Sequence, residues 1–97
     1  MDSRITNSEG ASFDSYTGYR VFANSRGFVN SYLTCNCSLA TVPVAKLGDA
    51  MERDYWMTAA RSASRLESPE LVGTTAAKRV LRRLGARKVA TQRVPVV

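Results

Sequence analysis

The feature that most constrains the fold is the alternation of apolar and polar side chains between residues 24 and 61. Its longest part is the segment 28–45. One set of alternate positions in that segment is apolar and comprises Leu33, Cys35, Cys37 and Leu39. A repeat of two is typical of a strand with one face on a core and the other in water. We predict a long strand with a bend at Pro43, which cannot donate a ladder hydrogen bond.

A second alternating segment covers residues 50–61, after a polar turn at residues 46–49. Its Met, Glu, Arg and Ala residues also suit an amphipathic helix, which is the alternative. Because Tyr55, Trp56 and Thr58 favour a pleated surface and the preceding turn suits a hairpin, we predict a strand.

The region before the long strand reads as a shorter hairpin. Residues 1–10 are polar and predict a lead-in, whereas residues 11–16 and 19–24 predict two strands joined by a turn at Thr17-Gly18. A further reversal is expected at residues 25–27, where Gly27 can adopt a positive φ.

Residues 68–84 carry the signals of an amphipathic helix. Ser68 suits the N-cap, Pro69 the first helical position and Glu70 the first turn, where the helix dipole favours an anion. Gly85 marks the expected end. The apolar positions recur every three or four residues and comprise Val72, Ala76, Ala77, Val80, Leu81 and Leu84. This stripe must pack on the sheet.

These elements predict an α+β fold: an antiparallel meander of about four strands, one amphipathic helix packed on it, and a trailing C-terminal strand in residues 88–97. A chain of 97 residues is one domain at most. The apolar end of this strand, at residues 94–97, leads us to expect that residues 1–97 are a piece of a longer chain.

The composition excludes several kinds of active site. The chain has no histidine, so it cannot form a Ser-His or Cys-His pair or an imidazole zinc site. Cys35 and Cys37 lie on one strand face without further ligands nearby, so we interpret them as reduced, apolar packing residues. No catalytic, cofactor-binding or metal-binding residue is predicted, and whether the parent protein is an enzyme stays open.

The net charge of +6 is concentrated in the second part of the chain. Residues 61–97 hold nine basic and two acidic side chains, whereas residues 1–60 hold five basic and six acidic ones. A basic face on the helix is the candidate polyanion contact of an alternative function, a small nucleic-acid-binding module; it comprises Lys78, Arg79, Arg82 and Arg83. No aromatic residue interleaves with these cations, so we favour a solvated face and do not expect a nucleic-acid partner.

The cluster Arg53, Asp54, Tyr55 and Trp56 is the candidate partner-contact surface, because aromatic and arginine side chains are enriched in interfaces. The alternative is that one aromatic packs under the helix while Arg53 and Asp54 pair with neighbouring strands. Alternation places Tyr55 and Trp56 on opposite faces, which favours this alternative for at least one of them.

Six segments, in order, resemble the central region of the TldD/PmbA family, also called modulators of DNA gyrase. They are ITNSEGASF, FANSRGF, SYLTCNCSLATVPVA, MERDYWMTAARS, LESPELVGTTAAKRVLRRLGARKV and RVPVV. The resemblance covers nearly the whole chain and is stronger to the PmbA (TldE-like) branch. It implies a metalloprotease complex for peptide maturation and proteolysis, with zinc held only by the TldD-type subunit through two histidines, a glutamate and a later cysteine. A cytoplasmic location is expected separately, because residues 1–97 show neither a signal-peptide pattern nor an apolar run long enough to span a bilayer.

None of those ligands can be carried over to this chain, which has no histidine, and neither Cys35 nor Cys37 stands at the ligand position. The resemblance therefore implies a non-catalytic central domain. Its expected partners are the rest of its parent chain, a TldD-type subunit or a second copy, and the peptide substrate. No membrane partner is expected, since no apolar run reaches the length that spans a bilayer.

Overall fold

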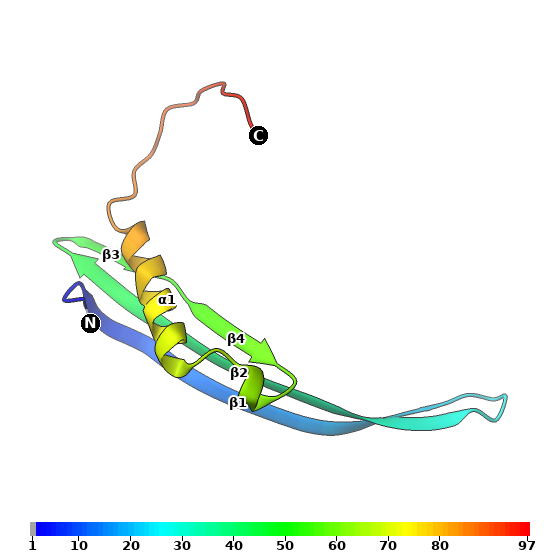
Figure 1. Cartoon of the computed structure of the whole chain (residues 1–97). Coiled ribbons are helices and arrows are strands. Elements are labelled where there is room, and N and C mark those ends of the chain that lie inside the picture. Colours follow the sequence, from blue (N-terminus) through cyan, green and yellow to red (C-terminus); the bar gives the residue numbers. More distant parts are fainter. Residues whose placement is uncertain (1) are drawn as a thin grey trace.

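The computed structural model describes residues 2–97 and shows an antiparallel sheet with one helix on it (Figure 1). The elements are β1 (Ile5–Ala23), β2 (Val29–Leu47), β3 (Ala50–Arg53), β4 (Trp56–Ala60), a 3₁₀ turn η1 (Ala63–Arg65) and α1 (Pro69–Arg83). The predicted α+β fold is confirmed. The prediction of a trailing C-terminal strand in residues 88–97 is wrong, because residues 86–97 belong to no strand. They lead away from the sheet, so no strand edge lies beside them to supply hydrogen bonds (Figure 1).

The hairpin of β1 and β2 is the largest part of the molecule. The two strands pair from Ile5↔Ala45 to Ala23↔Val29, and the chain reverses at residues 24–28. The Asn24 side chain accepts hydrogen bonds from the N–H groups of Arg26 and Phe28, at 2.9 and 3.2 Å, and Gly27 has φ +87°. The reversal predicted at residues 25–27 is thus confirmed.

The turn predicted at Thr17-Gly18 is wrong. Gly18 lies inside β1, opposite Thr34, and the strand already begins at Ile5 where a lead-in was expected. Met1, also in that lead-in, lies outside the described residues. A Cβ on Gly18 would clash with the ring and hydroxyl group of Tyr16, so the ring of Tyr16 lies over this glycine. Gly18 therefore makes room for an aromatic side chain rather than for a turn.

The strand predicted over residues 50–61 is present, in two parts. Gly48, with φ +59°, makes the turn into β3, and β3 and β4 both pair antiparallel with β2. The two strands continue the same pairing register along β2, since Arg53 pairs with Val44 and Trp56 pairs with Thr41. Between them, Asp54 and Tyr55 are the two residues that do not belong to a strand.

Pro43 lies at the point where both neighbouring strands become irregular. In β1, an extra residue is inserted between the pairs Ser8↔Pro43 and Gly10↔Val42. On the other side, the β3–β4 interruption faces the same part of β2. Because proline has no N–H group, it cannot complete a ladder hydrogen bond. β2 itself runs through Pro43 as one strand, so the irregularity falls in its neighbours.

The helix α1 begins as predicted. The Ser68 hydroxyl oxygen accepts a hydrogen bond from the Leu71 N–H at 3.2 Å, and Pro69 is the first helical residue. Gly85, with φ +77°, follows the last turn. The buried apolar side chains of residues 2–97 are small and comprise Cys37, Ala45, Val72, Ala76 and Val80. The core is therefore thin, and three of its residues come from the predicted helix stripe.

Beyond the helix, β1 and β2 continue as a two-stranded hairpin arm, residues 16–36 (Figure 1). The chain extends over 65 × 39 × 21 Å, with a radius of gyration of 20.8 Å, against about 13 Å for a compact domain of this length. The arm exposes eight large apolar side chains, which are Tyr16, Tyr19, Val21, Phe22, Phe28, Val29, Tyr32 and Leu33. Among residues 2–97, no helix has the length and apolar character to cross a membrane.

Candidate functional site

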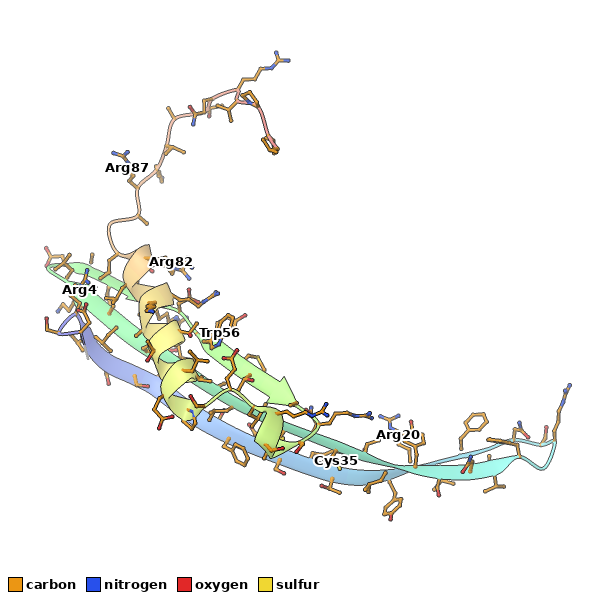
Figure 2. All side chains as sticks on the ribbon, in the orientation of Figure 1. Arg4, Arg20, Cys35, Trp56, Arg82 and Arg87 are labelled. Carbon is orange, nitrogen blue, oxygen red and sulfur yellow. The ribbon has the colours of Figure 1, made fainter. Side chains whose placement is uncertain are left out.

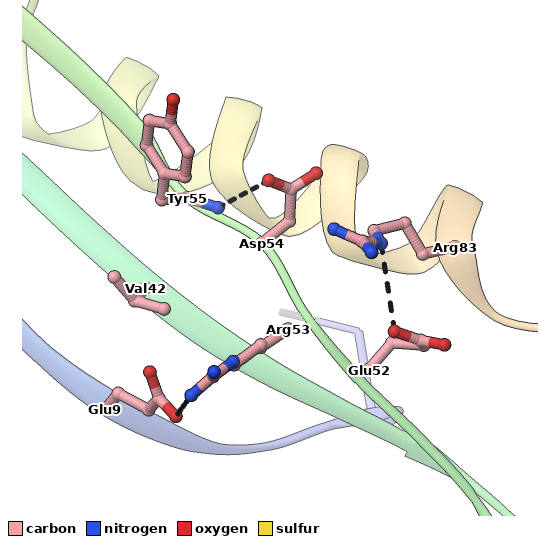
Figure 3. A pocket seen from close by; sticks show the side chains of 7 residues that line it. All are labelled: Glu9, Val42, Glu52, Arg53, Asp54, Tyr55 and Arg83. Atoms are coloured by element: carbon pink, nitrogen blue, oxygen red, sulfur yellow. Dashed lines mark hydrogen bonds and ion pairs between the residues drawn. The ribbon is translucent and has the colours of Figure 1, made fainter.

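The predicted contact cluster lies at the interruption between β3 and β4, where the edge of the sheet meets α1 (Figure 3). A cleft of about 370 Å³ opens there. Its lining combines three carboxylates with two guanidinium groups and comprises Glu9, Val42, Glu52, Arg53, Asp54, Tyr55 and Arg83. The site therefore draws side chains from β1, β2, the broken edge strand and the helix.

Asp54 is the most enclosed of the three carboxylates of the cleft, with 11% of its side chain exposed. It accepts a hydrogen bond from the Tyr55 N–H at 2.8 Å and forms an ion pair with Arg79, with 3.5 Å between Nε and Oδ2. The Tyr55 N–H lowers the pKa of Asp54 below its ordinary value of 3.8, and the positive charges of Arg79 and Arg83 act in the same direction against burial. Asp54 is therefore a structural anion.

Arg79 belongs to the candidate polyanion surface of the helix, yet its side chain contacts residues of the candidate partner-contact cluster. Its guanidinium carbon lies 5.3 Å from the centre of the Trp56 ring and 5.8 Å from that of Tyr55. Both rings thus border one cation, although alternation predicts opposite faces, because Tyr55 lies in the break where the strand pairing stops. Among the described residues, the buried Nε of Arg79 has no hydrogen-bond partner. The cation is held by the two rings, by its charge and by an Nη2–H hydrogen bond to the Asp54 carboxylate at 3.5 Å.

Two other ion pairs border the cleft. Arg53 of β3 reaches across β2 to Glu9, the residue inserted in β1, and Arg83 of α1 lies 3.7 Å from Glu52 (Figure 3). Arg53 keeps 69% of its side chain exposed, so its pair is worth little in water. Sequence reasoning missed Glu9 and Glu52, whose positions depend on the β1 insertion and on where the helix docks.

Trp56 is tied to the segment that leads into the helix. Its indole N–H donates a hydrogen bond to a Glu67 carboxylate oxygen at 2.9 Å, and the Glu67 N–H donates to the Thr58 hydroxyl at 3.2 Å. The sequence analysis did not single out Glu67. The signal that could have identified it is its position directly before the helix N-cap, Ser68. The two bonds fix the connection between β4 and α1.

The candidate polyanion surface is divided by these contacts. Arg79 and Arg83 pair with carboxylates of the sheet edge. Lys78 and Arg82 take part in none of the ion pairs of residues 2–97. Figure 2 shows Arg82 near the C-terminal end of α1. The surface available to a polyanion is therefore smaller than the sequence suggested, and its binding role stays a prediction.

The residues present do not fit the zinc site that the family resemblance associates with a partner subunit. Cys35 and Cys37 are both free thiols, and Cys37 is buried, with its Sγ 3.3 Å from the Ala60 carbonyl oxygen. Within residues 2–97, no three Cys, Asp or Glu side chains gather as a metal-binding group, and the sequence has no histidine. No reaction step is assigned to a metal here.

Comparison with known proteins identifies the family. Residues 1–84 match the model of the PmbA/TldA metallopeptidase central domain. The chain is 45% identical over 96 residues to the metalloprotease PmbA homolog of Haemophilus influenzae and to metalloprotease PmbA of Escherichia coli O157:H7. It is 40% identical to the homolog of Buchnera aphidicola from Acyrthosiphon pisum.

These matches include 99% of this chain but only about a fifth of each relative, 21% for the first two and 22% for the third. The matched region carries the sheet and the helix, which are the elements described above. By its match to the central-domain model and its identity to the relatives named PmbA, the chain belongs to the PmbA/TldD family of metallopeptidase-related proteins.

Proposed function

We propose that this chain is a non-catalytic central domain of a PmbA-like subunit in a peptide-processing metalloprotease complex. The observation that carries this proposal is the absence of histidine from a chain that matches the central-domain model over residues 1–84. The titratable groups of the cleft support it, because Asp54 is held ionised by its hydrogen bond and by two arginines. Such a carboxylate is poorly suited to taking up protons near neutral pH.

On this proposal, the domain shapes the parent subunit and its contact with a TldD-type subunit or a second copy. The candidate contact surface is the exposed part of the cluster at Arg53 and Tyr55, whereas Asp54 and Trp56 hold the helix to the sheet. The complex works in the cytoplasm on peptides for maturation or degradation, and zinc belongs to the TldD-type subunit.

A domain exchange tests the proposal. Residues 1–84 replace the corresponding region of the Haemophilus influenzae relative, and peptide hydrolysis is measured with its partner subunit present. An architectural domain with 45% identity should keep kcat within about tenfold of the parent. The matched control exchanges the same region and carries Val80→Asp, which should abolish assembly.

A scan of the titratable side chains distinguishes architecture from chemistry. In every folded variant with a single replacement, kcat should stay within about tenfold of the parent value. The replacements are Glu9→Gln, Glu52→Gln, Asp54→Asn, Cys35→Ser and Cys37→Ser. A folded variant whose kcat falls by about a thousandfold would identify a catalytic group and refute the proposal.

The alternative, a polyanion-binding module, is supported by the nine basic side chains of residues 61–97. Binding to single-stranded DNA, titrated with salt, tests it. A steep loss of affinity with salt supports this role, whereas no binding at low salt refutes it.

A further inference from the structure

A groove runs along one flank of α1, on the side of the first residues of β1. The helix packs on β2, β3 and β4, with Val72, Ala76 and Val80 buried (Figure 1). Beside that stripe, Gly73 and Ala77 are half-buried and line two hollows of about 420 and 580 Å³. Because both hollows share these two residues, they form one continuous groove.

The floor of the groove is an uncharged part of the sheet. The sheet residues that line the smaller hollow are Ile5, Thr6, Asn7, Ser8, Thr41 and Pro43. The larger hollow continues along the helix past Thr74 to Leu81, and the charged residues that line it are Asp2, Glu70 and Lys78. An occupant therefore needs an uncharged face of apolar and small side chains toward the floor.

Gly73 weakens the helix, and nothing in the chain uses the space that it leaves. Glycine inside a helix is less stable than alanine, because it fixes a more flexible backbone. A Cβ on Gly73 would meet no atom within 4 Å among the described residues. Its φ is not positive, so the local backbone does not require glycine either. The missing side chain leaves room for the close approach of another backbone.

The spacing of the groove residues fits a second helix. Gly73, Ala77 and Leu81 follow one another at intervals of four, so they form one row along α1. Small side chains in such a row let a ridge of another helix enter, with the two axes about 8–10 Å apart. An extended segment would find no ladder partner here, because the floor is the face of a sheet and not its edge.

The relatives supply a source for this helix. The chain matches only 21% of the length of the first two relatives, and the matching family model describes a central domain. A second copy is a poorer source. Its α1 already lies on its own sheet through Val80, so it could not also lie on the floor at Pro43.

We propose that an α-helix from another domain of the longer parent subunit lies in this groove, beside α1 and against Gly73 and Ala77. Two helices would then cover one face of the sheet, which closes the layer that α1 begins. This inference rests on the proposed function only in taking the chain as one domain of a larger subunit. Its tests measure accessibility and stability and not hydrolysis, so each proposal can fail without the other.

Cysteine labelling tests whether the groove is covered. Ala77→Cys and Ile5→Cys place a thiol on its wall and its floor, and the control Arg82→Cys places one on α1 outside it. Labelling by N-ethylmaleimide, resolved by mass spectrometry, is compared between the 97-residue chain and the Haemophilus influenzae relative that carries residues 1–84 in exchange. Both groove thiols should react at least about tenfold more slowly in the relative, and the control should differ less than about threefold.

Equal rates in the two proteins would overturn the proposal. Protection that is already present in the 97-residue chain and is lost on dilution would identify a second copy as the occupant, which would also overturn it.

Gly73→Leu should act differently in the two proteins. In the 97-residue chain it should leave Tm unchanged or raise it, because the space is open and leucine favours the helix. In the exchanged relative it should lower Tm by at least about 4 °C, because the docked helix would meet the new side chain. The control Arg82→Leu should shift both proteins alike. The same shift for Gly73→Leu in both would contradict a close helix contact.

Photo-cross-linking tests that the occupant is a helix. Replacing Leu81 with p-benzoylphenylalanine in the exchanged relative should give cross-links to one segment, at residues three or four apart. Cross-links to every second residue of a segment would indicate a strand and overturn the proposal.

Discussion

The guanidinium group of Arg79 lies against the carboxylate of Asp54, 3.5 Å away, in the gap between β3 and β4. The pair links the helix to the one part of the edge strand that makes no ladder pairs with β2. Only 11% of the Asp54 side chain and 33% of the Arg79 side chain are exposed, so solvent screens this pair less than the others.

Asp54→Asn should lower the free energy of unfolding by about 1–3 kcal/mol, because it leaves a partly buried cation without its counter-charge. Urea denaturation followed by circular dichroism measures the change. The control Asp14→Asn alters an exposed carboxylate on β1 and should stay within about 0.5 kcal/mol. A double-mutant cycle with Arg79→Gln should give a coupling energy above about 0.5 kcal/mol; additive effects would mean that the pair contributes nothing.

The stability of the chain should fall in acid partly through Asp54. Its pKa in the folded chain lies below the ordinary value of 3.8, so the unfolded chain binds the proton first as the pH falls. The contribution of Asp54 is therefore complete above that value and is lost as the pH drops through its folded pKa. The difference in stability between the parent chain and Asp54→Asn should be constant near neutral pH and should narrow as the pH falls below the ordinary value of 3.8. A difference that stays constant below that value would contradict the depressed pKa.

Trp56→Phe should destabilise the chain by about 1 kcal/mol, since the ring packing is kept while the Glu67 carboxylate loses its indole donor. Glu67→Gln retains an acceptor oxygen and should cost less than Glu67→Leu, which removes it. Circular dichroism is the suitable probe, because Trp56 is the single tryptophan of the sequence. Equal losses in the two Glu67 variants would show that the bond does not stabilise the connection.

Val80→Ala should cost about 2 kcal/mol, because Val80 is fully buried between helix and sheet in a core of few side chains. Val89→Ala is the matched control in the segment after α1, where the valine is exposed, and should change stability by less than about 0.5 kcal/mol. Thermal unfolding of both variants measures the contrast. Similar losses at the two positions would mean that the segment after the helix is packed in solution.

Sequence reasoning succeeded where the signal was local. The Ser68-Pro69 start, the stripe through Val72 and Val80, and the reversals at Gly27 and Gly48 are set by neighbouring residues. The alternating segments after the first reversal also became strands, because their apolar positions match the period of a pleated sheet.

It failed where the outcome depends on distant partners. Glycine is typical of turns, yet Gly18 lies inside β1, because it pairs with Thr34 of β2 and the Tyr16 ring covers it. Residues 88–97 have strand composition, yet no sheet edge lies beside them. The meeting of Arg79 with Asp54 and two aromatic rings depends on where the helix docks, and no local pattern encodes that position.

The small side chains between the helix and the sheet set the spacing of the two layers. Ala45 and Ala76 are completely inaccessible to solvent, so the backbones approach closely there. A larger residue at either position has no space to enter and would have to lift the helix off β2. Lifting the helix would also draw Arg79 away from Asp54, so two methyl groups in the interior determine whether an ion pair at the rim can form.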